Sequence, residues 1–280
     1  MAQMLAVPGH VRHGFSINCS FNYDFGRITG IAASTNGNIL VCDYDKKNLI
    51  LFNPVGNYFK KLNLDSEPYD VAITHQNIGY VTQPNIRSAL KIDPERMVVL
   101  LKATCNDLNT SPLCVSAFPN TNVIYTCNLS LHINGVTTMH GIYDNSLNCI
   151  LLIKKRLSSY AKGFDVVKIH ATDDCLYSCI AGQNNILVDT SFEETCSIGT
   201  IDTPTDICSD DYGHIYVSGQ GSNNIYRLQK KFGVLPTVLD IPLHSQHGIK
   251  QPVAICFIKV HTKLYIVNEW GKSVLVFDVC

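Results

Sequence analysis

The chain has 280 residues, of which 46% are hydrophobic and 16% are charged, and its formal net charge is -1 at pH 7. Charged residues are scarcer than in an average globular domain, which favours extensive buried β-surface. The near-neutral charge excludes a uniformly basic nucleic-acid-binding protein, although a local basic patch is compatible with it. No apolar run approaches the ~20 residues that a membrane-spanning helix needs.

The 12 cysteines are scattered along the chain and include no CxxC pair. Most lie inside apolar runs, where a free cysteine behaves as a small hydrophobic residue. The first ten residues, Met1–His10, lack the basic region and apolar core of a secretion signal. We therefore expect reduced thiols and a cytoplasmic location, and we interpret the glycosylation sequons at Asn18, Asn109 and Asn128 as chance matches.

The stretch Ile28–Asn53 predicts three short strands joined by two turns. The strands cover Gly30–Ala33, Asn38–Cys42 and Asn48–Phe52. Between the first two lies Asn36-Gly37, a strong hairpin signal because both residues tolerate a positive φ in a tight turn. The pattern indicates a small antiparallel unit.

This unit recurs along the chain at intervals of about 40 to 50 residues. In later copies the second strand carries a tyrosine at one fixed place, at Tyr80, Tyr125, Tyr177, Tyr216 and Tyr265. The first strand recurs at Asp70–Ile73, Cys114–Ala117, Asp165–Lys168, Asp206–Ser209 and Ala254–Phe257. Three or four short strands per repeat at this spacing are typical of a β-propeller.

The two ends of the chain predict how the ring closes. The sixth repeat stops at its third strand, Val274–Asp278, and the strand-like segment Phe15–Phe21 precedes the first repeat. Pairing these segments removes the exposed edge that an open sheet would leave. We therefore predict an all-β, six-bladed propeller that spans residues 1–280 as a single domain, with residues 15–21 as the closing strand. The irregular stretch Asn128–His140 is interpreted as a loop insertion.

The repeat resembles a known family. The pattern Asp/Asn-x-x-Gly-Asn-Ile-Leu/Tyr-Val, represented by Ser34–Cys42 and Asp210–Ser218, is similar to the NHL repeat. A first repeat that ends in Lys60-Lys61, followed by Pro68-Tyr69-Asp70-Val71-Ala72, resembles the C-terminal propeller of tripartite-motif (TRIM-NHL-like) proteins. In that family a RING, B-boxes and a coiled coil precede the propeller. The resemblance implies a recognition domain, with ubiquitin transfer residing in a RING domain that this sequence lacks.

Asp70, Asp165 and Asp206 occupy equivalent places at the starts of three repeats in this alignment. In a propeller such positions lie near the central channel. One interpretation is a Ca²⁺ or other hard-cation site, as in lactonase-like six-bladed enzymes. The other, which we favour, is that each carboxylate accepts hydrogen bonds from backbone N–H groups at its turn. We therefore expect no metal and no cofactor.

The loops on the same face combine basic and aromatic residues, which are suited to protein contacts or to stacking and clamping RNA. They carry Arg27, Tyr44, Lys46, Lys47, Tyr69, Arg87, Tyr160, Lys162, Lys250, Trp270 and Lys272. TRIM-NHL relatives bind RNA hairpins through this face. The alternative is a set of ordinary solvated loops. Trp270, the only tryptophan, is either an exposed binding residue or packed against a neighbouring blade.

No nucleophile motif, P-loop or dinucleotide fingerprint occurs in the chain. The sequence thus favours a non-catalytic binding module, the partner-recognition propeller of a TRIM-type ubiquitin ligase, with no small-molecule substrate and no membrane partner. A protein partner is favoured over RNA because of the neutral overall charge. An RNA-binding propeller and a metal-dependent hydrolase or lyase remain as alternatives.

Overall fold

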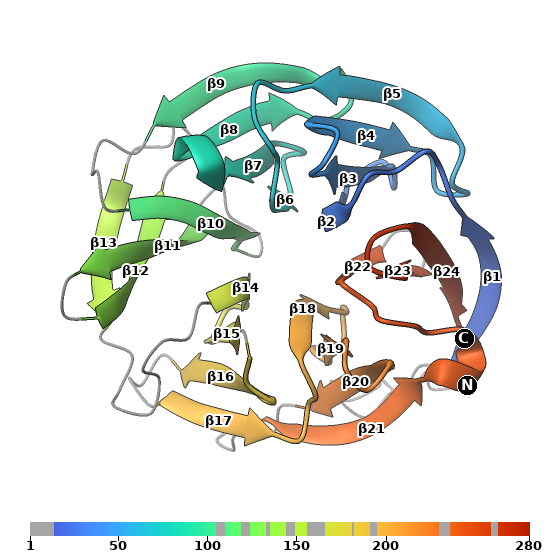
Figure 1. Cartoon of the computed structure of the whole chain (residues 1–280). Helices are drawn as coiled ribbons and strands as arrows, with labels where there is room; N and C mark the ends of the chain where they lie inside the picture. The colour runs from blue at the N-terminus through green and yellow to red at the C-terminus, as the bar shows by residue number, and fades with distance from the viewer. Residues whose placement is uncertain are drawn as a thin grey trace, which may run out of the picture.

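A computed structural model describes residues 14–104, 110–118, 124–132, 135–143, 149–155, 166–180, 182–190, 195–229, 236–258 and 263–280. Within these ranges, 24 strands hydrogen-bond into six four-stranded antiparallel sheets. The sheets surround a central axis, with β2, β6, β10, β14, β18 and β22 nearest to it (Figure 1). The described residues contain no helix that is long and apolar enough to cross a membrane.

Five of the described sheets are each built from four consecutive strands. Blade 1 contains β2 (Ile28–Ala33), β3 (Ile39–Asp43), β4 (Asn48–Phe52) and β5 (Tyr58–Asn63). Blade 2 contains β6 (Val71–Ile73), β7 (Gly79–Gln83), β8 (Ser88–Asp93) and β9 (Val98–Thr104). Blade 3 contains β10 (Thr110–Ala117), β11 (Ile124–His132), β12 (Gly135–Tyr143) and β13 (Cys149–Lys155). Blade 4 contains β14 (Val166–Ala171), β15 (Cys175–Ile180), β16 (Asn185–Thr190) and β17 (Thr195–Gly199). Blade 5 contains β18 (Pro204–Ser209), β19 (Ile215–Gly219), β20 (Asn224–Gln229) and β21 (Thr237–Leu243).

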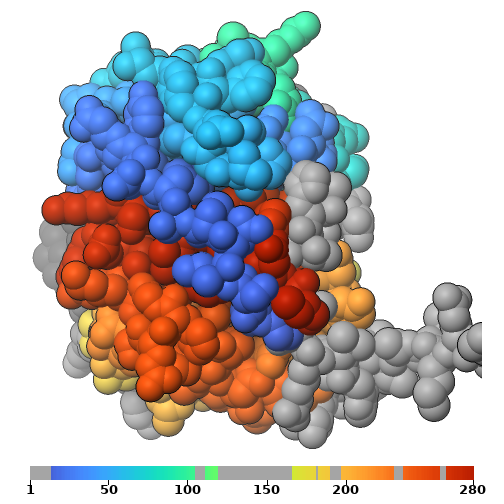
Figure 2. Space-filling view, turned by 90° about the vertical axis from the view of Figure 1, so that its right-hand side faces the viewer, coloured from blue at the N-terminus to red at the C-terminus, as the bar shows by residue number. Residues whose placement is uncertain are grey.

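The remaining sheet, blade 6, combines both ends of the chain. It contains β22 (Ala254–Ile258), β23 (Lys263–Asn268), β24 (Ser273–Val279) and, as its outer strand, β1 (Phe15–Phe21). β1 lies antiparallel to β24, and the amide of Gly14 donates to the Cys280 carbonyl at 3.1 Å. Figure 2 shows this blue N-terminal segment lying on the outer surface against the dark red C-terminal residues. The chain therefore contains five self-contained repeats and one composite blade.

The hydrophobic core lies between blades, because each sheet packs both of its faces against its neighbours. The repeated tyrosines of the second strands show this arrangement. Tyr80, Tyr177, Tyr216 and Tyr265 are each at most 1% exposed. Tyr216 stacks on Phe257 of the next blade, with ring centroids 5.8 Å apart. The side chain of Tyr125, the fifth member of the pattern, lies outside the described residues.

Two expectations about individual repeats are wrong. The stretch Asn128–His140 is not a loop insertion, since β11 and β12 continue through most of it and pair in unbroken register from Ile124↔Tyr143 to His132↔Gly135. The polar and small residues that suggested a loop are compatible with a long hairpin. The second wrong expectation is the alignment of blade 4, in which Lys168 rather than Asp165 occupies the place of Asp206.

In the described part of the chain, two short 3-10 helices connect strands. The first, Pro84–Ile86, joins β7 to β8, and the second, Ser245–His247, follows β21.

Ring closure by β1 makes a testable prediction. Deleting residues 1–22 removes the outer strand of blade 6 and exposes the edge of β24, so we expect a markedly lower melting temperature or aggregation. The matched point variants are Phe21→Ala and Ile17→Ala. The Phe21 ring lies 5.2 Å from that of Phe52, whereas Ile17 is 61% exposed. Phe21→Ala should cost about 2 kcal/mol, less than a fully buried phenylalanine, and Ile17→Ala close to nothing. An unchanged melting temperature in the truncated protein would refute this closure.

Candidate functional site

The innermost strands place one residue from each blade in a layer around the channel. Register shifts between Ile28 and Gly30, between Val166 and Lys168, and between Pro204 and Asp206 mark the same irregularity in three blades. In blade 4, Lys168 pairs with Cys179, and in blade 5, Asp206 pairs with Ser218. Lys168 and Asp206 therefore occupy equivalent places in their blades. The alignment that made Asp165 equivalent to Asp206 was therefore displaced by three residues. Asp165 itself lies outside the described residues.

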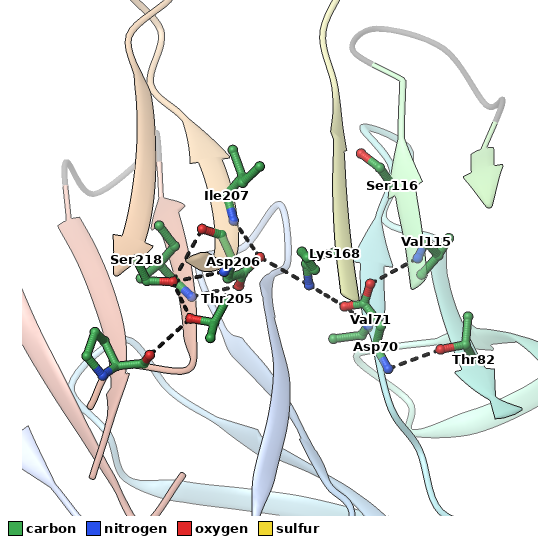
Figure 3. A network of polar contacts seen from close by, with 12 residues as sticks. Asp70, Val71, Thr82, Val115, Ser116, Lys168, Thr205, Asp206, Ile207 and Ser218 are labelled. Atoms are coloured by element: carbon green, nitrogen blue, oxygen red, sulfur yellow. Dashed lines mark hydrogen bonds and ion pairs between the residues drawn. The ribbon is translucent and has the colours of Figure 1, made fainter. Parts of the chain in front are cut away.

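Lys168 is the central residue of this layer, and sequence reasoning missed it as a site residue. Its ammonium nitrogen bonds to Oδ1 of Asp70 in blade 2 and lies 3.4 Å from Oδ1 of Asp206 in blade 5 (Figure 3). All three side chains are at least 90% buried. The available signal was the position of a lysine within the apolar run Val166-Val167-Lys168-Ile169, where a buried cation requires a carboxylate partner.

Each carboxylate also joins its own blade to the following one. Asp70 accepts hydrogen bonds from the Val71 amide at 2.8 Å and from the Val115 amide of blade 3 at 2.9 Å. Asp206 repeats the arrangement with Ile207 at 2.7 Å and with Ile255 of blade 6 at 2.8 Å. Both carboxylates thus accept backbone N–H bonds at the starts of their blades, and in addition they link neighbouring blades.

Burial and charge act in opposite directions on these groups. Burial lowers the pKa of Lys168, but the nearby Asp206 and Asp70 carboxylates outweigh burial and hold the pKa above its ordinary value. Burial raises the pKa of Asp206 to about 6, and the Lys168 ammonium counteracts only part of this. The lysine is therefore a fixed positive charge at neutral pH. It stands where the metal-site interpretation would have placed a cation, and the described residues contain no cluster of three metal-ligating side chains.

Above this layer, on the face predicted to bind, lies a pocket of about 370 Å³ that we call the rim pocket. Its floor includes Asp70 and Lys168, and its walls include the predicted residues Arg27, Tyr44, Tyr69 and Trp270. The Arg27 guanidinium lies 4.6 Å from the centroid of the Tyr44 ring, and Tyr44 meets Tyr69 edge-on at 6.4 Å. The opposite wall contains Pro204 and Gln220, which sequence reasoning did not identify.

Trp270 is exposed rather than packed against a neighbouring blade, with 52% of its surface accessible. Its backbone has φ +59°, a left-handed conformation that costs a bulky residue about 1–3 kcal/mol. Hydrogen bonds hold the turn: the Trp270 amide donates to Gln251 at 3.3 Å, and the Ile28 amide donates to Gly271 at 3.2 Å. A Cβ on Gly271 would lie 2.6 Å from backbone atoms of Ile28, so only glycine fits there. This close approach places Trp270 beside Arg27.

The other predicted basic residues that the structure describes, Lys46, Lys47, Arg87, Lys250 and Lys272, lie outside the rim pocket, and three of them pair with carboxylates. Lys46 contacts Asp24 at 2.6 Å, Lys47 contacts Glu67 at 3.1 Å, and Lys250 contacts Glu269 at 3.5 Å. Arg87 is exposed at the end of the short helix Pro84–Ile86, and Lys272 is exposed in the Trp270 turn. Tyr160 and Lys162 lie outside the described residues. The structure therefore brings four of the eleven predicted residues together.

A second hollow, of about 460 Å³, lies at the other end of the channel. The later halves of the innermost strands line it, and His170 Nε2 lies 3.0 Å from Ser209 Oγ across two blades. Lys168 lines both hollows. The Asp70–Lys168–Asp206 layer thus lies between the two hollows.

Comparisons with known proteins show the fold. Virginiamycin B lyase from Staphylococcus aureus superposes with a TM-score of 0.66 at 14% identity, covering 95% of this chain and 100% of that one. Hydrazine synthase from Kuenenia stuttgartiensis gives 0.65 at 10% identity, covering 91% and 96%. A protein of unknown function from Bacteroides thetaiotaomicron gives 0.68 at 12% identity, covering 96% and 76%. No protein-family profile and no curated protein matches the chain. At these identities the likeness establishes a β-propeller and nothing finer.

Removing the buried ammonium is the first test of the site. Lys168→Met keeps the length of the side chain but leaves two buried carboxylates without their counterion. We expect a loss of about 3–5 kcal/mol in the free energy of unfolding, measured by chemical denaturation. The control is Lys102→Met, which breaks the exposed Lys102–Asp65 pair and should cost less than about 1 kcal/mol. Equal losses in the two variants would contradict a structural role for Lys168.

The raised pKa of Asp206 predicts a pH dependence of stability. Its folded pKa of about 6 lies above the roughly 3.9 of an unfolded aspartate. Its contribution to stability is therefore complete below the unfolded value and is lost as the pH rises through 6. Between about pH 7.5 and pH 5 the wild type should gain stability relative to Asp206→Asn, which does not titrate. Denaturation curves at several pH values measure this difference, and parallel pH profiles for the two proteins would contradict it.

Proposed function

We propose that this propeller is a non-catalytic recognition module that binds a protein partner through the rim pocket and the loops around it. The carrying observation is the exposed Trp270 beside Arg27, Tyr44 and Tyr69. Exposed tryptophan, tyrosine and arginine are the residues most enriched among those that dominate binding energy at protein interfaces. The resemblance to TRIM-NHL propellers extends this proposal to substrate recognition for a TRIM-type ubiquitin ligase.

The charge distribution favours a protein partner over RNA. An RNA-binding rim needs cations that are free to contact phosphates. Here Lys46, Lys47 and Lys250 each have a carboxylate within 3.5 Å. The rim consequently offers aromatic surface and paired charges rather than a continuous positive track. Capture with and without ribonuclease distinguishes RNA binding from protein binding.

The floor of the rim pocket favours binding over catalysis. A general base needs a lone pair that can reach the substrate. Both oxygens of Asp70 already accept hydrogen bonds, from Val71, Val115 and Lys168. No histidine, cysteine or serine is among the described residues that line the pocket. Among the described lining residues, these contacts favour binding over the chemistry of the lyase that shares the fold.

The proposed location is a reducing, cytoplasmic compartment. The eight cysteines whose side chains the structure describes are free thiols. Six of them, including Cys42 and Cys179, are buried in the packed strands. Burial raises the pKa of the Cys42 and Cys179 thiols well above the ordinary value, so these groups are poorly reactive.

Comparative capture tests the proposal. Immobilised wild type, Trp270→Ala, Arg27→Ala and the control Phe59→Ala are incubated with cell extract, with and without ribonuclease. Phe59 is 57% exposed on the outer strand β5, away from the pocket. We expect a set of proteins that the wild type and the control retain, that both rim variants lose, and that ribonuclease does not release. Capture that is abolished by ribonuclease would instead support RNA binding, and equal capture by all four proteins would refute the rim as the binding surface.

A further inference from the structure

Three described side chains that line the rim pocket offer hydrogen-bond donors to a ligand. Arg27 has half of its side-chain surface exposed, and its only ion-pair partner in the described residues, Asp45, is 3.6 Å away and equally exposed. Neither the side-chain amide of Gln220 nor the indole N–H of Trp270 has a hydrogen-bond partner among the described residues. The one carboxylate among the described lining residues, Asp70, already accepts three hydrogen bonds within the protein. A complementary ligand therefore supplies acceptors.

The walls of the same pocket present flat apolar surface. Tyr44 and Tyr69 meet edge-on, Trp270 lies on the side of blade 6, and Pro204 lies on the side of blade 5. Aromatic faces arranged around a shallow hollow favour rigid, flat side chains that lose little entropy when they bind. The volume of about 370 Å³ falls at the small end of ligand pockets. It suits a few side chains of an extended segment rather than a whole helix.

The available hydrogen-bond donors and the flat apolar walls together favour one conformation of a bound peptide. We propose that the rim pocket binds a proline-containing segment in the polyproline II conformation; this proposal rests on the protein-recognition function argued above. Proline has no N–H, and the polyproline II backbone leaves its carbonyls free of internal hydrogen bonds. Such a segment is an acceptor-rich ligand with flat rings, and aromatic-lined grooves are the surfaces that bind it. The interior of a helix would offer no free backbone acceptors to the donors of Arg27, Gln220 and Trp270.

The positive charge of Arg27 favours an acidic residue next to the prolines of the ligand. Among the described lining residues, Arg27 and Lys168 are the cations, and Lys168 is buried between two carboxylates. Arg27 is therefore the cation available to a ligand, because its contact with Asp45 is long and solvent-exposed. An aspartate or glutamate beside the prolines would pair with it through charge-assisted hydrogen bonds.

The single tryptophan makes the proposal directly measurable, because all tryptophan fluorescence of the chain comes from Trp270. The probe is a capped decapeptide of prolines interrupted by two aspartates. One control peptide replaces every proline by alanine, and a second replaces both aspartates by asparagine. We expect saturable quenching or a spectral shift with the first peptide. The alanine peptide should bind at least about tenfold more weakly, and the asparagine peptide several-fold more weakly.

Protein variants locate the binding. Arg27→Ala should weaken binding of the aspartate peptide about tenfold and leave the asparagine peptide nearly unchanged, whereas the control Arg96→Ala should alter neither. Arg96 is exposed in the β8–β9 turn, outside the rim pocket. Trp270→Ala, measured by calorimetry, should abolish both. Melting temperatures confirm that each variant is folded, and a fluorescence titration of the folded wild type alone suffices if a variant is not.

Two results would overturn the proposal: no response of Trp270 to either proline peptide, or equal binding of the proline and alanine peptides. If the rim variants still lose their captured proteins in that case, the recognition function stands and only the polyproline II ligand is wrong. If capture is also unchanged in the rim variants, the recognition function fails as well.

Discussion

The ring depends on one buried ammonium group shared by two carboxylates. Lys168 connects Asp70 of blade 2 with Asp206 of blade 5, and those carboxylates extend the connection to Val115 of blade 3 and Ile255 of blade 6 (Figure 3). Two carboxylates and one ammonium in a water-poor channel are stable only when each charge is paired and hydrogen-bonded. The hydrophobic surfaces between blades supply the bulk of the burial, whereas this layer fixes how the innermost strands are placed relative to one another.

The same layer shapes what the propeller can bind. Because it lies between the two hollows, a ligand at the rim meets a floor whose charges are already satisfied. Binding energy must then come from the surrounding loops, where Arg27, Tyr44 and Trp270 are accessible. A channel with unpaired carboxylates would have suited a hard cation and the chemistry that it supports. Here the Lys168 ammonium lies between the two carboxylates, and the proposed recognition relies on the loops, which a rigid propeller presents in fixed positions.

Features that depend on residues close together in the sequence could be predicted, whereas features that depend on contacts between distant loops could not. Strand alternation, the Asn36-Gly37 turn and the repeated tyrosines are local signals, and they located most strands. The pairing of Phe15–Phe21 with β24 could be inferred because the last repeat lacks an outer strand. The place of Lys168 could not, because Asp165-Val166 resembles Asp206-Ile207 in sequence, and matching the two displaced blade 4 by three residues. Which rim lysines meet carboxylates, as Lys47 meets Glu67, depends on loop geometry that no periodicity encodes.

The rim pocket is a property of the closed ring rather than of any one repeat. Arg27 and Tyr44 come from blade 1, Tyr69 leads into blade 2, and Trp270 comes from blade 6. The Ile28–Gly271 hydrogen bond, which glycine alone permits at that distance, joins the blades on either side of the closure. The strained turn at Trp270 is tolerated because these neighbours hold it. The contact between blades 1 and 6 that holds Trp270 beside Arg27 therefore belongs to the seam at which the ring closes, so the proposed recognition depends on ring closure.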